Sequence, residues 1–251
     1  MSKPLPIWML VGIACLGSSS IWAEDTTSVV LNHSDIELHY EQAVRLDKVL
    51  LDALQQDNHR HGLHTYHEGF RLFSDKKQSQ ADVLYVEVAT QLNALLSDDD
   101  YRMPAQQLLT QLKHYQYGFR EHINLDVDVV RMHEELNPRL QGQYHLQLMK
   151  RPNTVMLFGL PKDHVPFHAT STVADYIQQS QPTQKRHHSY AWVITPSGDI
   201  ERVGYAYWNN ESTHLMPGSA LLVGFDSKNN DMIELEENIA KLISMIKGKA
   251  Q

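Results

Sequence analysis

Cysteine is nearly absent from this chain of 251 residues, which contains a single one, Cys15. Cys15 lies in an N-terminal segment that we expect to be cleaved, so the mature protein would contain no cysteine. This excludes disulfide bonds, thiolate nucleophiles and cysteine-ligated zinc from the mature chain. The sequence also lacks a phosphate loop, a dinucleotide fingerprint and a Gly-x-Ser-x-Gly elbow. We therefore expect no cofactor.

Positive charge is also scarce. The chain has 22 Lys and Arg against 30 Asp and Glu, for a net charge of −8 at pH 7 with neutral histidines. An acidic chain without a basic stripe argues against a nucleic-acid partner and against electrostatic attachment to anionic lipid. An apolar run of about 20 residues, as a membrane-spanning helix requires, is missing as well. We expect neither nucleic-acid binding nor stable membrane insertion.

The N-terminus has the pattern of a secretory signal peptide over residues 1–23. Lys3 supplies a short basic region, Ile7 to Leu16 form an apolar core, and a small residue, Ala23, ends the segment. Cleavage after Ala23 would release a periplasmic chain beginning at Glu24. The alternative, lipidation of Cys15, is disfavoured because Gly12 stands where a large aliphatic residue is expected.

The second half of the chain reads as one β-β-α-β-β unit, which we place in a domain over residues 152–230. Apolar or β-branched runs predict strands near 155–159, 165–167, 190–195, 200–208 and 221–225. Thr172 followed three residues later by Asp175 is a capping-box pattern and predicts a helix start. Turn signals at 196–199 and 216–219 separate the later strands.

The first domain, over residues 24–151, begins in the same way. Period-two alternation near 29–40 predicts two strands, and apolar residues at helical spacing predict a helix near 46–54. A helical hairpin at about 75–116 then interrupts this copy, and we expect it to pack on the first sheet. Alternation through Ile123, Leu125, Val127 and Val129 predicts a return to strand. The fold class is α+β, and we interpret the repeat as two β-grasp domains.

The last segment, residues 231–251, predicts an amphipathic helix. Five apolar residues gather on one face, Leu235, Ile239, Leu242, Ile243 and Ile246. Acidic residues near its start and lysines toward its end suit the helix dipole. The polar face is too acidic for a typical membrane-surface helix, so we expect the helix to pack on its own protein.

Histidine supplies the sharpest chemical signal, with His59, His61, His64 and His67 inside nine residues. Imidazoles can bind zinc, nickel or copper. The metalloprotease helix motif is absent, however, and Gly62 and Gly69 favour a polar connector. These four residues are therefore only weak metal candidates. Likewise, Asp126 and Asp128 are not evidently a catalytic pair, because any solvent-facing acids on one strand would alternate in this way.

Two further groups are candidates for binding. Arg120 follows the predicted helical insertion and can contact a carboxylate or a sugar acid through its planar guanidinium; the alternative is a structural salt bridge to Asp126 or Glu121. Tyr207 and Trp208 could stack on sugar rings. Aromatic residues among strands are more often part of the core, as we expect for Trp192.

The order and spacing of several short motifs resemble the GfcC/YjbG family of periplasmic group 4 capsule and exopolysaccharide biosynthesis proteins. The similar segments include Gly118 and Arg120, Val130-Arg131, Asn137-Pro138, Arg151-Pro152, Thr195 to Gly198, Trp208-Asn209 and Pro217 to Ser219. The resemblance implies two β-grasp domains, the second similar to the SLBB domains of polysaccharide exporters, with a helical insert and a C-terminal amphipathic helix. It also makes Arg120 a functional candidate in a cleft, and Arg131, eleven residues later in the matching Val130-Arg131 segment, a further binding candidate.

The sequence therefore predicts a non-enzymatic periplasmic accessory protein of capsule or exopolysaccharide assembly and export. We expect it to bind the nascent polysaccharide or a protein of the export machinery, and to be monomeric in isolation. Two alternatives remain open. One is a periplasmic carbohydrate-modifying enzyme whose carboxylates are not identifiable, and the other is a metal-binding module that uses the His59–His67 loop.

Overall fold

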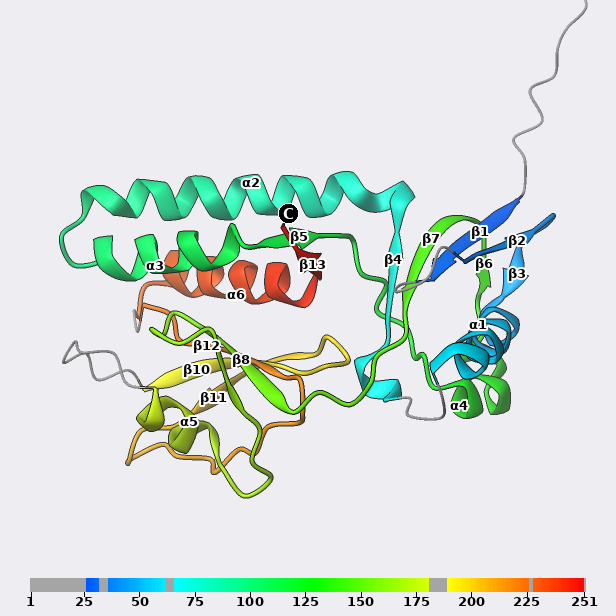
Figure 1. Ribbon diagram of the computed structural model, residues 1–251. Coiled ribbons are helices and arrows are strands. Elements are labelled where there is room, and N and C mark those ends of the chain that lie inside the picture. Colours follow the sequence, from blue (N-terminus) through cyan, green and yellow to red (C-terminus); the bar gives the residue numbers. More distant parts are fainter. Residues whose placement is uncertain (1–25, 32–35, 62–65, 181–188, 226–227, 251) are drawn as a thin grey trace, which may run out of the picture.

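The computed structural model describes residues 26–31, 36–61, 66–180, 189–225 and 228–250. Within these ranges the chain is α+β, with two principal mixed sheets and a layer of helices (Figure 1). No helix in the described ranges is long and apolar enough to cross a membrane. The expected signal peptide lies outside the described residues.

The first sheet has the strand order β2-β1-β7-β4. It consists of β1 (Thr27–Leu31), β2 (Glu37–Tyr40), β4 (Arg71–Ser74) and β7 (Gly142–Gln147). β1 is antiparallel to β2 and parallel to β7, and β7 is antiparallel to β4. Helices α1 (Leu46–His61) and α4 (Val127–Met132) cover one face and share its buried cluster. A two-stranded ladder of β3 (Val44–Arg45) and β6 (Arg139–Leu140) lies beside them.

The second sheet has the order β11-β10-β12-β8-β9 and repeats the arrangement of the first. Its strands are β8 (Thr154–Phe158), β9 (His164–Pro166), β10 (Tyr190–Ile194), β11 (Ile200–Gly204) and β12 (Ala220–Leu222). β8 is antiparallel to β9 and parallel to β12. Helix α5 (Val173–Gln179) covers one face, and its predicted capping box between Thr172 and Asp175 is present. The predicted β-β-α repeat is thus confirmed.

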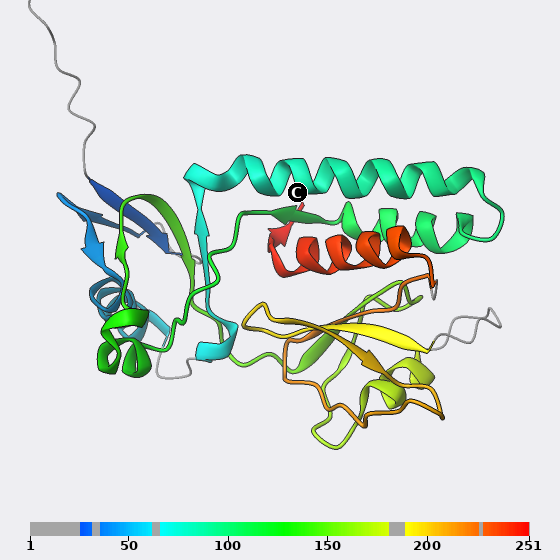
Figure 2. The ribbon, with the colours of Figure 1, turned by 180° about the vertical axis from the view of Figure 1, so that it is seen from behind.

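The helical hairpin does not pack on the first sheet, so that prediction is wrong. It consists of η2 (Asp75–Lys77), α2 (Gln78–Ala94), η3 (Leu95–Ser97) and α3 (Arg102–Leu112), ending in β5 (Tyr115–Tyr117). Figures 1 and 2 show α2 and α3 extending away from the first sheet and lying above the second. Their apolar faces share a buried cluster with α6 (Asn230–Ser244) and with β8, β10 and β12. By packing there, the hairpin buries its apolar faces against α6 and the second sheet.

Two other expectations of secondary structure are corrected. The alternation from Ile123 to Val129 does not form a strand, because α4 begins at Val127, and η4 (Glu134–Leu136) follows it. The side chain of Asp126 accepts the backbone N–H groups of Asp128 and Val129, which is the N-cap pattern that starts a helix. The terminal helix ends at Ser244, and β13 (Ile246–Lys249) then pairs with β5.

The terminal helix packs on the protein, as predicted. Leu235, Ile239, Leu242 and Ile243 of the helix are buried in the cluster between the helical layer and the second sheet, and the fifth predicted residue, Ile246, joins the same cluster from β13. The carboxylate of Glu236, also buried, accepts hydrogen bonds from Trp192 Nε1 (2.9 Å) and the backbone N–H of Phe225 (2.6 Å). Helix α6 is therefore fixed to the second sheet by apolar contact and by one buried acceptor.

Ile239→Ala should lower the free energy of unfolding by about 2–4 kcal/mol, because it leaves a cavity at a position with 0% exposure. Urea denaturation measures the change. Val86→Ala is the control, since Val86 is exposed on α2, and should shift stability by no more than about 0.5 kcal/mol. Equal effects at the two positions would contradict the placement of α6 in the core.

Candidate functional site at the junction of the two sheets

Arg120 lies where the two sheets and the terminal helix meet. It pairs with Phe73 in an isolated antiparallel bridge and is 2% exposed. Its Nη2 donates to the carbonyl oxygens of Pro196 (2.7 Å) and Phe70 (3.2 Å), and its Nη1 donates to that of Ser244 (3.4 Å). One guanidinium therefore connects the first sheet, the β10–β11 turn and the end of α6.

The β10–β11 turn fits against this guanidinium through a glycine. Gly198 has a φ of +102°, and a Cβ added there would lie 3.1 Å from Arg120 Cζ. A side chain at this position would be strained by the backbone and would crowd the guanidinium. The turn is also braced internally, since Ser197 Oγ lies 2.7 Å from Asp199 Oδ2 and from Thr195 Oγ1.

The strand that follows α6, β13, receives further donors from the first sheet. Arg71 Nη1 donates to the carbonyl oxygen of Ile246 (2.8 Å), and Gln147 Nε2 donates to that of Lys247 (2.7 Å). The Ser244 carbonyl, which accepts from Arg120, belongs to the last turn of α6, where carbonyls lack partners within the helix and carry partial negative charge, so a cationic donor suits it. Burial, together with the charge of Arg71, lowers the pKa of Arg120, while Asp199 acts in the opposite direction. Guanidinium nevertheless stays charged in proteins, and its carbonyl partners offset its burial.

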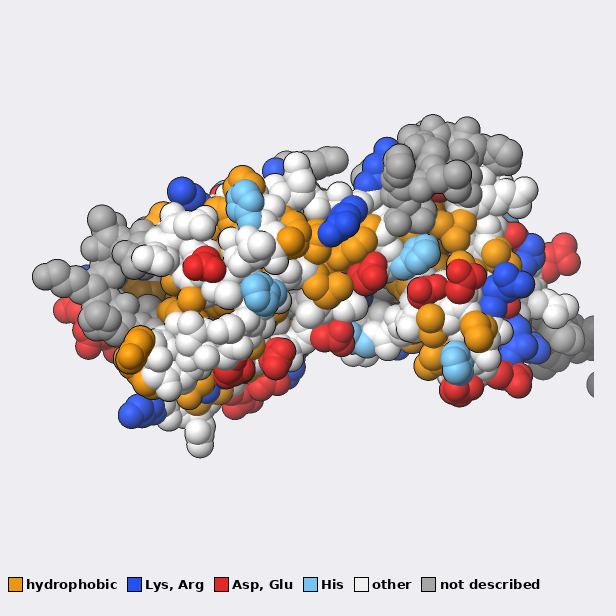
Figure 3. Space-filling model, turned by 90° about the horizontal axis from the view of Figure 1, so that it is seen from below, with side chains coloured by type: hydrophobic (Ala, Val, Ile, Leu, Met, Phe, Trp, Pro, Cys, Tyr) orange, Lys and Arg blue, Asp and Glu red, His pale blue; other side chains and the backbone are white. Residues whose placement is uncertain are grey.

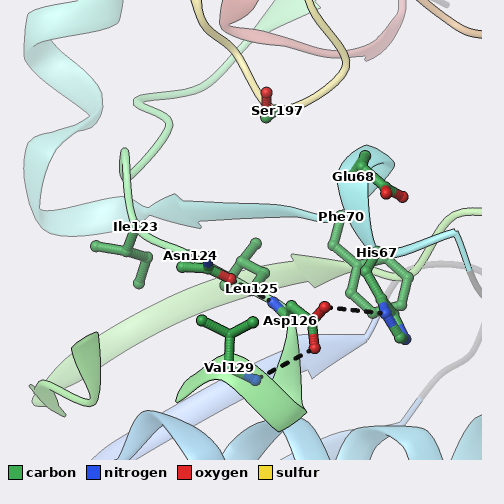
Figure 4. Close-up of a pocket in the computed structure, with 9 residues that line it drawn as sticks. All are labelled: His67, Glu68, Phe70, Ile123, Asn124, Leu125, Asp126, Val129 and Ser197. Carbon is green, nitrogen blue, oxygen red and sulfur yellow. Dashed lines mark hydrogen bonds and ion pairs between the residues drawn. The ribbon is translucent and has the colours of Figure 1, made fainter. Parts of the chain in front are cut away.

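A cavity of about 290 Å³, the junction pocket, opens beside this contact. Its walls come from η1 (His67–Gly69) with Phe70, from the segment 123–126 with Val129, and from Ser197 of the β10–β11 turn (Figure 4). Two of these residues are coupled to Arg120: Phe70 supplies an acceptor, and Ser197 follows the acceptor Pro196. Arg120 thus holds two walls of the pocket without lining it. Seen from below, the molecule narrows between the part that contains the first sheet and the part that contains the second sheet (Figure 3).

His67 and Asp126 face each other in this pocket, with 3.8 Å between Nδ1 and Oδ2 (Figure 4). The other carboxylate oxygen of Asp126 caps α4, and Asn124 Oδ1 accepts the backbone N–H of Asp126 (2.8 Å). Ser197 lies on the opposite wall, apart from His67, with its hydroxyl directed at its own turn. These groups can hydrogen-bond a polar ligand, and their placement differs from that of a nucleophile beside a base.

The structure changes the interpretation of Arg120. A partly buried guanidinium available to an acidic ligand was expected, whereas the side chain is buried and engaged by carbonyl groups. The alternative, a structural salt bridge to Glu121 or Asp126, is not formed either, because Glu121 pairs with Lys77 at 2.8 Å and Asp126 faces His67. A direct ligand contact by Arg120 would require the loss of those acceptors, so we regard it as a positioning residue.

The other predicted site residues are dispersed. Arg131 is exposed on α4, and Tyr207 and Trp208 are 100% and 70% exposed after β11. Trp192 is buried, as expected. His64 and the side chains of His59 and His61 lie outside the described residues, and only His67 reaches the junction pocket. In the described part of the chain, no three His, Cys, Asp or Glu residues are grouped to hold a metal ion.

Sequence reasoning missed the role of Arg71 and the contribution of Asn124 and Ser197 to the pocket. A signal was available for the segment before α4, because Asp126 preceding an apolar run is an N-cap pattern. No local sequence pattern predicts that Arg120 contacts Phe70 and Pro196. These residues are 50 and 76 positions away from Arg120 in the sequence.

Comparison with known proteins gives two consecutive family matches. Residues 23–151 match the family described as "Capsule biosynthesis GfcC, N-terminal", and residues 162–245 match "Capsule biosynthesis GfcC C-terminal". The chain is also 42% identical over 107 residues to the uncharacterized protein YjbG of Escherichia coli (strain K12). That alignment covers 42% of this chain and 44% of the relative, so the chain spans less than half of its length.

Arg120→Ala should lower the free energy of unfolding by about 2–4 kcal/mol, because three buried carbonyls lose a charged donor. Arg120→Lys should recover only part of the loss, since an ammonium cannot reproduce the planar fork. Arg131→Ala, at an exposed arginine, is the control and should change stability by less than about 0.5 kcal/mol. An Arg120→Ala protein of unchanged stability in urea denaturation would contradict the positioning role.

Proposed function

Since the chain belongs to the GfcC family of capsule biosynthesis proteins, we propose that it is a non-enzymatic periplasmic accessory of capsule or exopolysaccharide assembly and export. The observation that carries this proposal is the pair of family matches, over residues 23–151 and 162–245. It acts by binding the nascent polysaccharide or a protein of the export machinery.

Both sheets are assigned in this proposal to the β-grasp fold, the second being SLBB-like. Support comes from their common topology: a hairpin is followed by a helix, and the first hairpin strand lies parallel to the last strand of the sheet. The proposed domains cover residues 24–151 and 152–230, with the terminal helix bridging them.

Binding rather than catalysis is favoured by the way polar groups are used in the junction pocket. The carboxylate of Asp126 is shared between the α4 cap and His67, and the Ser197 hydroxyl is bonded within its turn. A glycosidase needs two carboxyl groups converging on one sugar bond. The pocket provides hydrogen-bonding groups on a small concave surface, which suits recognition of a hydroxylated ligand.

The proposed location depends on the signal-peptide pattern of residues 1–23. Deletion of the gene should reduce surface polysaccharide, and expression of the full chain should restore it. A chain starting at Glu24 behind a new methionine should not restore it, because it would remain in the cytoplasm. Polysaccharide is measured on whole cells, and immunoblots confirm equal amounts of the two chains. Rescue by the leaderless chain, or a deletion without any phenotype, would contradict the proposal.

Tyr207 and Trp208 are the best-placed groups for contact with a polysaccharide. The turn that carries them is fixed by Asn209, whose Oδ1 accepts the N–H of Ala206 (2.9 Å) and whose Nδ2 donates to the Ser189 carbonyl (3.0 Å). Large aromatic side chains held in solvent cost hydration free energy without adding to the core. A binding role accounts for their exposure on so ordered a turn.

The double substitution Tyr207→Ala and Trp208→Ala should weaken binding of the purified protein to its cells' isolated polysaccharide by about tenfold or more, while the melting temperature stays within about 2 °C. Retention of the protein on immobilised polysaccharide measures the effect. Met132→Ala, which removes an exposed apolar side chain from α4, is the control and should bind normally. Unchanged retention of the double variant would exclude this aromatic pair from the binding surface.

A further inference from the structure

A second hollow, of about 420 Å³, lies away from the junction pocket, between the end of α3, the β8–β9 turn and β13. We call it the basic hollow. The charged and aromatic side chains that line it are Lys113, His114, Tyr115, Asp163, His164 and Lys249. Its volume falls within the range of roughly 300–1,000 Å³ found for small-molecule sites. None of these residues was a candidate from the sequence.

The charge of the basic hollow is opposite to that of the chain as a whole. Two lysines and two histidines face a single carboxylate, Asp163, on a protein whose net charge is −8. Lysine ammonium groups act as point charges that attract carboxylate or phosphate. A concave surface concentrates such charge and favours an anionic ligand.

The β8–β9 turn, which forms one side of the hollow, is fixed by the buried side-chain amide of Gln111. Gln111 Nε2 donates to Asp163 Oδ1 (2.9 Å) and to the carbonyl oxygens of Leu160 (3.0 Å) and Leu157 (3.3 Å). Its Oε1 accepts the N–H of Gly159 (2.8 Å). One side chain of α3 therefore fixes the β8–β9 turn and the direction of the Asp163 carboxylate, and the turn is pre-organised before any ligand arrives.

The opposite wall is set by strand pairing. In the β5–β13 ladder Lys249 is the register partner of Tyr115, and the N–H of Ala250 donates to the His114 carbonyl (2.8 Å). The Tyr115 ring packs against Phe158 with 5.8 Å between centroids. Burial, and then the charge of Asp163, raise the pKa of Tyr115, so its hydroxyl stays neutral and can donate a hydrogen bond.

We propose that the basic hollow binds the carboxylate-bearing sugar of an acidic saccharide, with Lys113 and Lys249 on its carboxylate and Asp163 accepting from its hydroxyls. A simple anion would gain nothing from Asp163, whose negative charge repels it. A ligand with one acidic group and several hydroxyls uses both kinds of group and the Tyr115 ring. The choice of a saccharide rests on the proposed function, whereas the preference for an anion rests on the charges alone.

The test is binding of trigalacturonate to the purified chain, measured by calorimetry and by NMR shifts of the residues lining the hollow. The probe for the role of charge is the same trimer with its carboxylates methyl-esterified. Lys113→Gln and Lys249→Gln should each weaken binding of the acid by about tenfold, the usual scale for one charge-assisted contact. Both lysines are exposed, so the fold should persist. Lys76→Gln, at an exposed lysine of η2 that does not line the hollow, is the matched control and should bind normally.

Preference for the acid over the ester, lost in the lysine variants and kept in Lys76→Gln, would support the proposal. Equal binding of acid and ester, absence of binding, or unchanged binding by the Lys113→Gln and Lys249→Gln variants would overturn it. Inorganic phosphate that competes fully with the trimer at equal concentration would also overturn it, by showing a generic anion site. These outcomes are independent of the gene-deletion experiment, so the proposed function can stand when the basic hollow fails.

Discussion

The arrangement of this molecule depends on one buried guanidinium that donates to three carbonyls from three parts of the chain. Phe70 belongs to the segment before β4, Pro196 to the β10–β11 turn and Ser244 to the end of α6. Each acceptor is a backbone group that would otherwise lack a partner in a buried place, which carries a substantial energetic penalty. Because the same cation satisfies all three, displacement of any one part leaves a polar group of another unpaired. The two sheets and the terminal helix thus meet at one side chain, which also holds two walls of the junction pocket.

Helix α6 acts as the strut between the two sheets, because its two ends are held by different partners. Toward its start, the buried carboxylate of Glu236 binds Trp192 and the Phe225 backbone, and a Cβ at Gly224 would collide with that carboxylate. At its end, Arg120 donates to the carbonyl of Ser244, and Arg71 donates to the carbonyl of Ile246 in the strand that follows, β13. The helix is therefore held to the second sheet through the Glu236 carboxylate, and at its other end a carbonyl accepts a hydrogen bond from an arginine. Its apolar face is what the hairpin of α2 and α3 covers, which explains why this insertion lies far from the sheet in which it originates.

Local signals in the sequence were sufficient for most elements of the fold but not for their packing. The capping box at Thr172 and the period-two alternation in β1 and β2 are encoded by neighbouring residues, and both predictions hold. The alternation from Ile123 to Val129 wrongly predicted a strand, because the same residues can start a short helix when Asp126 caps it. The contacts of Arg120 could not be predicted for a different reason. The carboxylates considered as its alternative partners, Glu121 and Asp126, pair with Lys77 and His67 instead. The acceptors that Arg120 does use are backbone carbonyls, which have no sequence signature. The same limitation concealed the basic hollow, which is assembled from three segments about 50 to 135 positions apart.

The junction pocket and the basic hollow differ in how their charged groups are engaged. In the junction pocket, Asp126 caps a helix and Ser197 braces a turn, so a ligand there would compete with contacts that stabilise the fold. Such a ligand would also touch walls that Arg120 connects to both sheets, and binding would be coupled to their relative placement. In the basic hollow, by contrast, Gln111 holds Asp163 from behind while the lysines remain exposed. Recognition there requires no rearrangement of the fold. A ligand in the junction pocket would therefore compete with contacts that hold the fold, whereas the lysines of the basic hollow are available without breaking such contacts.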